Sequence, residues 1–286
     1  MALSPAGRVA RSTARPHSET GGDARLRTFL YTSDGVPIDS VYEPGTVVYS
    51  TGTPPSARPA FVVAHGFTGD ADRPQVRRVA EAFGRYGGVV TFSFRGHGAS
   101  GGRSTVGDRE VLDLAAAVAR ARELGHRRVV TVGFSMGGSV VLRQAALYGR
   151  DSELHPDAVV SVSAPARWYY RGTAPMRRLH WLVTRPGGRL VSRCALRTRI
   201  HHRAWDPVPL SPVEAVPRIA PTPLLVVHGD QDGYFPVDHP RMLAAAAGDH
   251  GELWLEPGMG HAEHAAGDGL LRRIGDWAAA RTGRAG

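Results

Sequence analysis

Six short apolar runs recur along the chain between residues 60 and 255, and segments of helical periodicity separate them. Four of the runs are apolar throughout apart from at most one Thr or Ser, rather than alternating, which is typical of strands that are covered on both faces. Strand and helix alternate over about 220 residues, which favours a mostly parallel, doubly wound α/β sheet. The predicted strands are Ala60–Ala64, Val89–Phe94, Val129–Phe134, Ala158–Val162, Leu224–Val227 and Glu252–Leu255.

The segments between the strands repeat apolar residues at the three- and four-residue spacing of a helix face. Asp108–Leu124, for example, aligns Val111, Leu114 and Val118. Pro74 fits the first turn of its helix, where a missing N–H costs little. The predicted helices are Arg73–Tyr86, Asp108–Leu124, Gly138–Leu147, Asp238–Ala247 and Gly269–Ala280.

The alternation breaks between Ala166 and Pro217, and we call residues 166–217 the cap segment. It holds Trp168, Tyr169, Tyr170, Trp181 and Trp205. Aromatic residues in an insertion usually pack against something, so we predict an inserted cap over the carboxyl edge of the sheet rather than a long surface excursion. Residues 26–165 and 218–286 then form the α/β core.

The residues before the first apolar run have a different composition. Residues 1–25 are polar and contain Pro and Gly, and they are predicted to be a disordered tail. Short β-rich pieces follow at Leu26–Tyr31 and Val47–Tyr49, around a turn at Ser33–Gly35.

Composition narrows the class of protein. The net charge is +9, and all 35 basic residues are Arg, which together with abundant Ala, Gly and Pro is typical of compositional bias. No nucleic-acid motif accompanies the charge, so nucleic acid is not a predicted partner. There is no apolar run of membrane-spanning length and no apolar leader within Met1–Arg27. A single cysteine, Cys194, fits a reducing compartment, and we predict a cytoplasmic protein with its oligomeric state left open.

The stretch Gly133-Phe134-Ser135-Met136-Gly137 lies between a predicted strand and a predicted helix. In that context G-x-S-x-G indicates a nucleophile elbow, a sharp turn that holds Ser135 in a strained conformation. Gly133 and Gly137 avoid the collisions that larger residues would make. The elbow presents the Ser135 hydroxyl at the positive end of a helix.

A serine hydroxyl needs a base, and the base needs an orienting acid. In enzymes with this elbow the acid and then the base follow the serine along the chain. Asp230 and Asp232 both lie in the turn after Leu224–Val227, and we select Asp232; the alternative is that both acids only stabilise the turn. The Gly-rich loop after the last strand ends at His261, which we select as the base.

Several other histidines compete for the role of base. His264 is the runner-up to His261, because it lies three residues further on. His239 and His250 lie in or beside the preceding helix and are predicted to be solvent-exposed.

Two backbone donors are needed for the negative charge that develops on a carbonyl oxygen. We predict the N–H of Met136, directly after the nucleophile, and the N–H of Phe67, in the loop after Ala60–Ala64. His65 and Gly66 are predicted to shape that loop.

Five motifs resemble those of the α/β-hydrolase superfamily, and specifically its cap-bearing serine esterase, lipase and peptidase-like branch. They appear in the family's order and cover roughly Leu26 to Ala280. They are His65-Gly66-Phe67, Arg95-Gly96-His97-Gly98, Gly133-Phe134-Ser135-Met136-Gly137-Gly138, His228-Gly229-Asp230-Gln231-Asp232 and Gly258-Met259-Gly260-His261.

The resemblance implies roles for individual residues. In the family the second acid of the His-Gly-x-x-Asp turn is catalytic, which supports Asp232, and the Arg-Gly-His-Gly turn is structural, so His97 is not a candidate. Serine at position 135 speaks against the haloalkane dehalogenases and epoxide hydrolases, which use Asp there, and the dienelactone hydrolases, which use Cys.

These residues predict a serine hydrolase that cleaves small-molecule carboxylic esters through an acyl-enzyme intermediate. A thioesterase, peptidase or acyltransferase with the same residues, or a non-catalytic ligand-binding homologue, are the alternatives. No cofactor is implied. The pairs His201-His202 and His261/His264 lack a full ligand set, so no metal is predicted.

The cap segment is rich in arginine. This charge has two interpretations: a site for an anionic substrate or lipid surface, or a solvated face. Because exposed charge runs are mostly solvated, the sequence favours the second.

Overall fold

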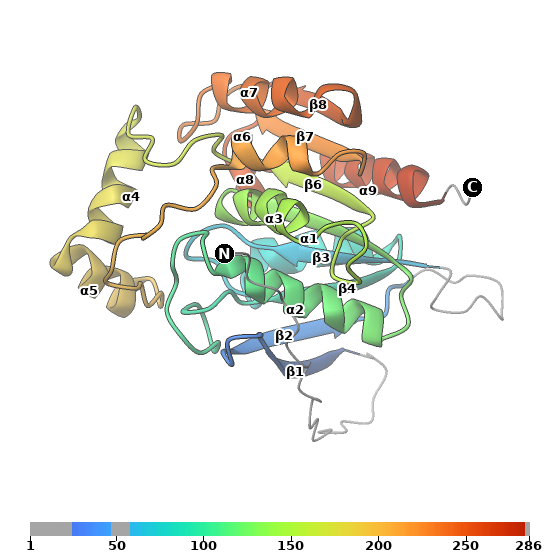
Figure 1. Ribbon diagram of the computed structural model, residues 1–286, viewed down its shortest axis with the longest axis horizontal. Coiled ribbons are helices and arrows are strands. Elements are labelled where there is room, and N and C mark those ends of the chain that lie inside the picture. Colours follow the sequence, from blue (N-terminus) through green and yellow to red (C-terminus); the bar gives the residue numbers. More distant parts are fainter. Residues whose placement is uncertain (1–24, 47–57, 284–286) are drawn as a thin grey trace.

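The computed structural model describes residues 25–46 and 58–283 (Figure 1). Eight strands form a sheet in the order β1-β2-β4-β3-β5-β6-β7-β8. β1, β2 and β4 pair antiparallel, and the remaining pairs are parallel. The strands are β1 (Leu26–Tyr31), β2 (Pro37–Glu43), β3 (Pro59–Ala64), β4 (Gly88–Phe92), β5 (Arg128–Phe134), β6 (Ala158–Val162), β7 (Leu224–Gly229) and β8 (Gly251–Glu256).

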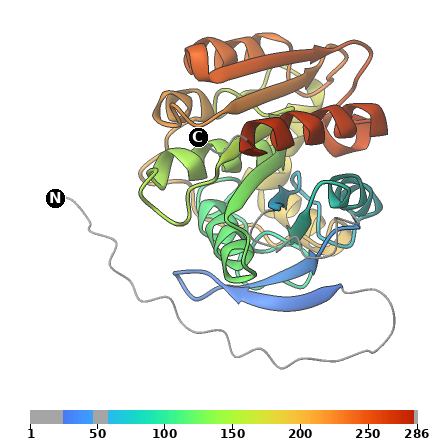
Figure 2. The ribbon, with the colours of Figure 1, turned by 90° about the vertical axis from the view of Figure 1, so that its right-hand side faces the viewer.

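Helices cover both faces of the sheet, as Figure 2 shows. Leu114 of α2, Val141 of α3 and Leu243 of α7 are fully buried on one face. Phe83 of α1 and Ile274 of α9 are fully buried on the other. The helices are α1 (Pro74–Gly84), α2 (Glu110–Glu123), α3 (Met136–Leu147), α4 (Ala174–Thr184), α5 (Pro186–Ala195), α6 (Pro212–Ala215), α7 (Asp238–Ala247), α8 (Ala262–Ala265) and α9 (Asp268–Gly283).

The two hydrophobic clusters explain why these strands are mainly apolar rather than alternating: every residue of β4, β6 and β7 is buried. The predicted mostly parallel, doubly wound α/β sheet is confirmed. Within the described ranges, no helix combines the length and apolarity that crossing a bilayer requires.

The amino-terminal part of the sheet differs from the prediction. Strand β2 was not predicted, because its buried residues Asp39 and Ser40 interrupt the apolar pattern. The Asp39 carboxylate is satisfied by Arg27 of β1, at 2.6 and 2.7 Å. The predicted β piece Val47–Tyr49 and residues 1–24 of the predicted tail lie outside the described residues.

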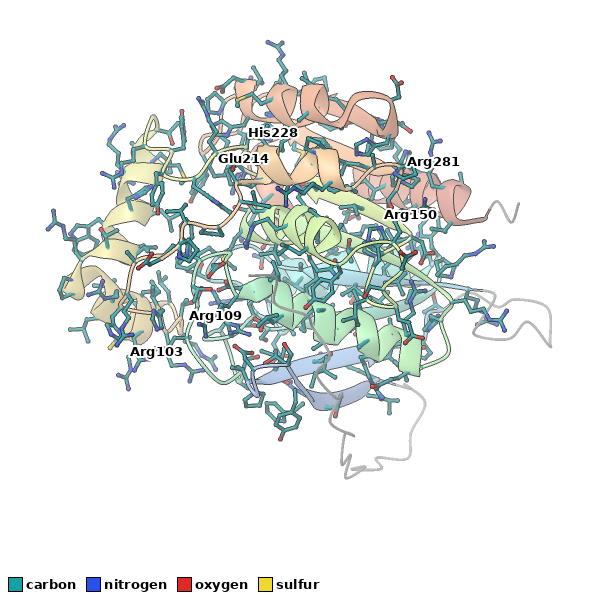
Figure 3. All side chains as sticks on the ribbon, viewed as in Figure 1. Arg103, Arg109, Arg150, Glu214, His228 and Arg281 are labelled. Carbon is teal, nitrogen blue, oxygen red and sulfur yellow. The ribbon has the colours of Figure 1, made fainter. Side chains whose placement is uncertain are left out.

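The cap segment leaves the sheet after β6 and returns before β7. Its helices α4 and α5 lie beyond the sheet (Figure 1), and Arg150 lies at the opposite end of the molecule (Figure 3). The segment is tied to the loop after β4, because Ser104 N–H donates to the Arg199 carbonyl at 2.7 Å and Arg199 N–H donates to the Gly96 carbonyl at 2.8 Å. Gly96 has a φ of 77°, and a Cβ there would lie 2.4 Å from the Arg199 oxygen. This approach therefore requires glycine.

Candidate active site

Ser135 occupies a strained turn between β5 and α3. Its φ is 52° and its ψ is −112°, in a region that side chains rarely adopt. A Cβ on Gly133 would lie 2.2 Å from the Gly137 oxygen, and a Cβ on Gly137 would lie 2.2 Å from the Ala64 oxygen. The sequence therefore allows the strained turn only because both positions are glycine.

Three side chains that are distant along the chain meet at this turn. His261 Nε2 lies 2.9 Å from Ser135 Oγ, and His261 Nδ1 lies 2.8 Å from Asp232 Oδ2. Asp232 follows β7, and His261 stands between β8 and α8. Since β5, β7 and β8 run parallel, their carboxyl ends bring the three loops to one edge of the sheet.

The Asp232 side chain is fully buried, and its carboxylate has several hydrogen-bond partners. Oδ1 accepts the backbone N–H groups of Tyr234 at 2.8 Å and Phe235 at 3.1 Å. Burial by itself would raise the pKa of Asp232, but the hydrogen bond and charge of His261 and these two N–H groups outweigh it and hold the pKa below its usual value. An ionised Asp232 fixes the proton of His261 on Nδ1, so that Nε2 faces Ser135 as an acceptor.

The competing acid and base have different surroundings. Asp230 is exposed, and its Oδ1 accepts the Gly258 N–H at 2.7 Å, which joins the turn after β7 to the loop after β8. His264 is exposed on α8. The structure brings neither of them to Ser135.

The prediction that His239 and His250 are solvent-exposed is wrong. His239 is fully buried, where its Nδ1 accepts the Ala166 N–H at 2.9 Å and its ring lies 4.6 Å from that of Tyr170. The reason is that the inner face of α7 packs beneath the start of the cap segment. Burial lowers the pKa of His239 to about 4. His250 is half-buried.

Phe67 and Met136, the predicted backbone donors, both line a cavity together with Ser135. Met136 is the first residue of α3, where helical N–H groups have no partner within the helix. Within the described part of the chain, neither the Phe67 N–H nor the Met136 N–H donates to a protein acceptor. Both are therefore available to a ligand atom.

His65 shapes the loop that carries Phe67. It is fully buried; its Nε2 accepts the Phe94 N–H at 3.0 Å, and its Nδ1 lies 2.7 Å from the Gly66 carbonyl. Burial lowers the pKa of His65 to about 3, so the ring is neutral and Nδ1–H donates to Gly66.

Glu263 was not singled out in the sequence analysis. Its buried carboxylate accepts the Gly66 N–H at 3.1 Å and so joins the loop after β3 to the helix that follows His261. The two residues are 197 positions apart, and no local pattern pairs them. The only signal in the sequence is an acidic residue two positions after the selected base.

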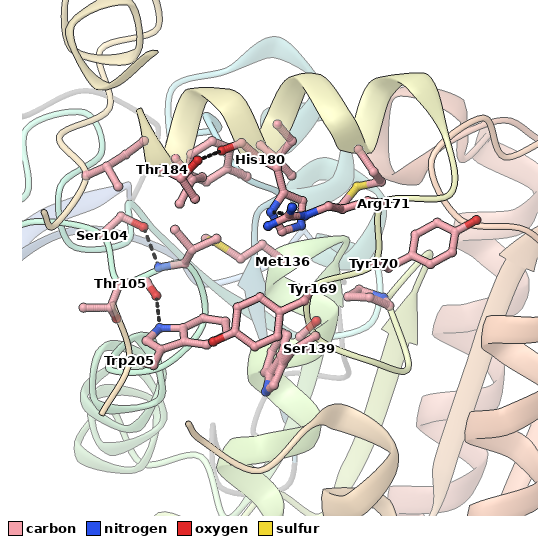
Figure 4. Close-up of a pocket in the computed structure, with 18 of the residues that line it drawn as sticks. Ser104, Thr105, Met136, Ser139, Tyr169, Tyr170, Arg171, His180, Thr184 and Trp205 are labelled. Carbon is pink, nitrogen blue, oxygen red and sulfur yellow. Dashed lines mark hydrogen bonds between the residues drawn. The ribbon is translucent and has the colours of Figure 1, made fainter. Parts of the chain in front are cut away.

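Ser135 and residues of the cap segment line one cavity of about 210 Å³. Figure 4 shows Tyr169, Arg171, His180 and Trp205 of the cap segment around it. Trp205 Nε1 donates to the Thr105 carbonyl at 2.7 Å, which fixes the orientation of its ring. Arg171 and His180 supply polar groups and hydrogen-bond to each other at 3.3 Å. The lining is otherwise mainly apolar or aromatic and includes Phe67, Met136, Trp168, Tyr169, Leu179, Val183, Trp205 and Phe235. Such a cavity suits a small apolar ligand.

No group of three or more His, Cys, Asp or Glu side chains in residues 25–46 and 58–283 could hold a metal ion. The His201 and His202 rings stack with centroids 5.0 Å apart, and His201 lines the cavity. His201 therefore contributes to the shape of the cavity.

The chain is similar to proteins of known class. A model of the alpha/beta hydrolase family matches residues 61–272. A monoacylglycerol lipase of Mycolicibacterium smegmatis is 27% identical over 251 residues, which cover 75% of this chain and 85% of the lipase.

Solved structures share the fold. An esterase of Pyrococcus furiosus superposes with a TM-score of 0.68 at 21% identity, covering 94% of this chain and all of the esterase. A serine hydrolase of Xanthomonas campestris, described as without lid, has a TM-score of 0.60 at 20% identity, covering 92% and 97%. With a family match across most of its length and this sheet topology, the chain belongs to the alpha/beta hydrolase family.

Proposed function

We propose that this protein is a serine hydrolase that cleaves small-molecule carboxylic esters, with Ser135 as nucleophile, His261 as base and Asp232 as orienting acid. The observation that carries the proposal is the continuous pair of hydrogen bonds from Asp232 through His261 to Ser135, at 2.8 and 2.9 Å. Ser135, at the end of this pair, lines a mainly apolar cavity. A serine, a histidine and a buried carboxylate in this order are the requirements of acyl transfer at neutral pH.

The reaction proceeds in two steps. His261 Nε2 takes the proton of Ser135 Oγ as the oxygen attacks the ester carbonyl, and the N–H groups of Phe67 and Met136 receive the negative charge on the carbonyl oxygen. His261 then protonates the leaving alcohol, and the acyl group remains on Ser135. In the second step His261 takes a proton from a water molecule as the water oxygen attacks the acyl carbonyl. His261 returns the proton to Ser135 Oγ as the bond between Oγ and the acyl carbon breaks and the acid is released. This chemistry requires neither a metal nor an organic cofactor.

Two contacts maintain the geometry of the site. The Glu263 carboxylate holds Gly66, directly before the proposed donor Phe67. The Tyr234 ring stacks on His261 with centroids 4.2 Å apart, which restricts rotation of the imidazole. Preorganised donors and bases of this kind lower the reorganisation needed in the transition state.

The cap segment is proposed to select the substrate. Trp168, Tyr169, Tyr170 and Trp205 line the cavity together with Ser135, so an apolar or aromatic acyl group of limited size fits best. In this organisation residues 166–217 form a cap on a core of residues 26–165 and 218–286.

Ester cleavage is favoured over thioester or amide cleavage by the esterase and lipase named among the similar proteins. The same residues would attack all three kinds of bond. Matched ester, thioester and amide substrates with one acyl group separate these reactions, and we expect the highest kcat/KM for the ester. An acyltransferase would instead require an added alcohol acceptor.

Labelling with a p-nitrophenyl phosphonate, followed by peptide mapping, tests the nucleophile. We expect modification at Ser135 and a fall in kcat of at least about 10⁴-fold in Ser135→Ala with a short p-nitrophenyl ester. Ser139→Ala is the matched control, because Ser139 also lines the cavity, one helical turn away. Labelling at another residue, or full turnover by a folded Ser135→Ala variant, contradicts the proposal.

A further inference from the structure

The cap segment carries an uninterrupted run of one charge. Between Arg167 and Trp205 the sequence has ten arginines and no Asp or Glu. The arginines are Arg167, Arg171, Arg177, Arg178, Arg185, Arg189, Arg193, Arg197, Arg199 and Arg203. A bias toward arginine explains the absence of lysine but does not explain the absence of acids.

Ion pairing differs between the core and the cap segment. Many core arginines have carboxylate partners; for example, Arg27 pairs with Asp39, and Arg273 with Glu256. Among the ten arginines of the cap segment, only Arg167 pairs with a carboxylate of the described residues, that of Asp238 at 3.2 Å. Unbalanced like charges repel one another, so this surface gains stability when an anion covers it.

Large apolar side chains are exposed between these charges. On α4, Trp181 is 49% exposed and lies beside the exposed residues Arg177 and Arg178. On α5, Leu190 is 62% and Val191 is 44% exposed, next to exposed Arg193. We call Arg177, Arg178, Trp181, Leu190, Val191 and Arg193 the cap surface.

The two faces of α4 have different roles. Met176, Leu179 and Val183 point inward and line the cavity above Ser135. Arg177, Arg178 and Trp181 point outward, at three- and four-residue spacing. The inner face of α4 is therefore apolar, and its outer face combines two arginines with an exposed tryptophan.

We infer that the cap surface docks onto an anionic lipid bilayer. Arginine guanidinium groups bind lipid phosphates, and exposed Trp and Leu side chains insert at the boundary between headgroups and acyl chains. A purely polyanionic partner such as nucleic acid would not need three exposed apolar residues. Docking would bring the helix that lines the cavity into contact with the lipid phase.

Co-sedimentation with lipid vesicles tests this inference in the absence of substrate, so its outcome is independent of the proposed ester hydrolysis. The vesicles are phosphatidylcholine alone, and phosphatidylcholine mixed with an equal part of phosphatidylglycerol. We expect the full chain to sediment with the mixed vesicles only and to be released by high salt, which shortens the screening length.

Two variants separate the contribution of the arginine charges to vesicle binding from that of apolar insertion into the bilayer. Arg177→Gln/Arg178→Gln should weaken partitioning by about 25-fold, because each basic side chain near an anionic surface contributes about fivefold. Trp181→Ala should weaken it by about tenfold, because the buried indole area is lost. The matched control is Arg127→Gln/Arg150→Gln, which removes two exposed arginines outside the cap segment and should bind as the wild type does.

Circular dichroism and turnover of a soluble ester check that each variant is folded, since none of these side chains lines the cavity. Failure of the wild type to bind mixed vesicles overturns the inference. An equal loss of vesicle binding in Arg127→Gln/Arg150→Gln also overturns the inference, because binding would then depend on the net charge of the protein and not on the cap surface. If Trp181→Ala binds the mixed vesicles as the wild type does, the cap surface binds polyanions in general, and the inference that it docks into lipid is overturned.

Discussion

Two aspartates in one turn, Asp230 and Asp232, illustrate how surroundings decide the role of a residue. They are two positions apart and chemically identical, yet Asp230 is exposed, whereas the side chain of Asp232 is fully buried. Asp232 accepts hydrogen bonds from His261 and from two backbone N–H groups, whereas Asp230 accepts one from Gly258. Only Asp232 can therefore fix the proton on His261.

Replacing each acid by its amide tests this difference. Asp232→Asn should lower kcat by about 10⁴-fold with little change in stability, because the amide donates to His261 and favours the wrong tautomer. Asp230→Asn should retain full turnover, because the amide oxygen still accepts the Gly258 N–H. Steady-state kinetics on a p-nitrophenyl ester measures both, and a loss confined to the Asp230 variant would reverse our assignment.

At the scale of the elements, the approach of α3 to β3 and β5 positions Ser135. Gly137 in the first turn of α3 lies so close to β3 that a Cβ would reach the Ala64 oxygen at 2.2 Å and the His65 oxygen at 2.7 Å. Both contacts are with backbone, which cannot move aside as a flexible side chain can. The contact between helix and strand, rather than the serine alone, therefore determines where the hydroxyl lies.

Gly137→Ala should consequently destabilise the fold by about 3 kcal/mol or more, since overpacking against backbone requires the helix to shift. Gly149→Ala, after α3, is the matched control, because a Cβ there would meet no atom within 4 Å. Urea unfolding followed by circular dichroism gives the free energies of unfolding. Equal stability of the two variants would contradict the close approach.

At the scale of the whole molecule, buried titratable groups couple folding to pH. Burial lowers the pKa of His239 from 6.5 to about 4 and raises that of Asp113 to about 7. Below pH 6.5 the unfolded chain binds a proton at His239 that the folded protein excludes, so this histidine removes stability as the pH falls toward 4. Asp113 binds its proton more tightly in the folded protein, so its contribution to stability has the opposite sign and increases as the pH falls below 7.

Because Asp113 has the opposite effect, the contribution of His239 to the pH dependence of stability is measured by comparing the wild type with a variant at position 239. His239→Asn keeps an acceptor for the Ala166 N–H but cannot titrate. Between pH 7 and pH 5 the stability of the wild type should fall relative to this variant by up to about 2 kcal/mol, at about 1.4 kcal/mol per pH unit below pH 6.5. Urea unfolding at both pH values measures the difference. A difference that does not change with pH would mean that His239 titrates normally in the folded protein.

Local patterns in the sequence determined the alternation of strands and helices, because strands buried on both faces must be apolar and helices must present an apolar stripe. They also determined the strained turn at Ser135, since its conformation depends on Gly133 and Gly137, only two positions away. Chain order and the ends of predicted strands selected His261 and the turn that holds Asp230 and Asp232, and the family's His-Gly-x-x-Asp pattern supported Asp232 over Asp230.

Tertiary structure alone decided the features that depend on burial of polar groups by distant residues. Strand β2 is buried although it contains Asp39, because Arg27 satisfies the carboxylate. His239 is buried because the cap segment covers α7, and Glu263 reaches Gly66 across 197 positions. The physical reason is common to all three: a polar side chain can be buried wherever a partner satisfies it, and the partner's position is set by the fold rather than by neighbouring residues.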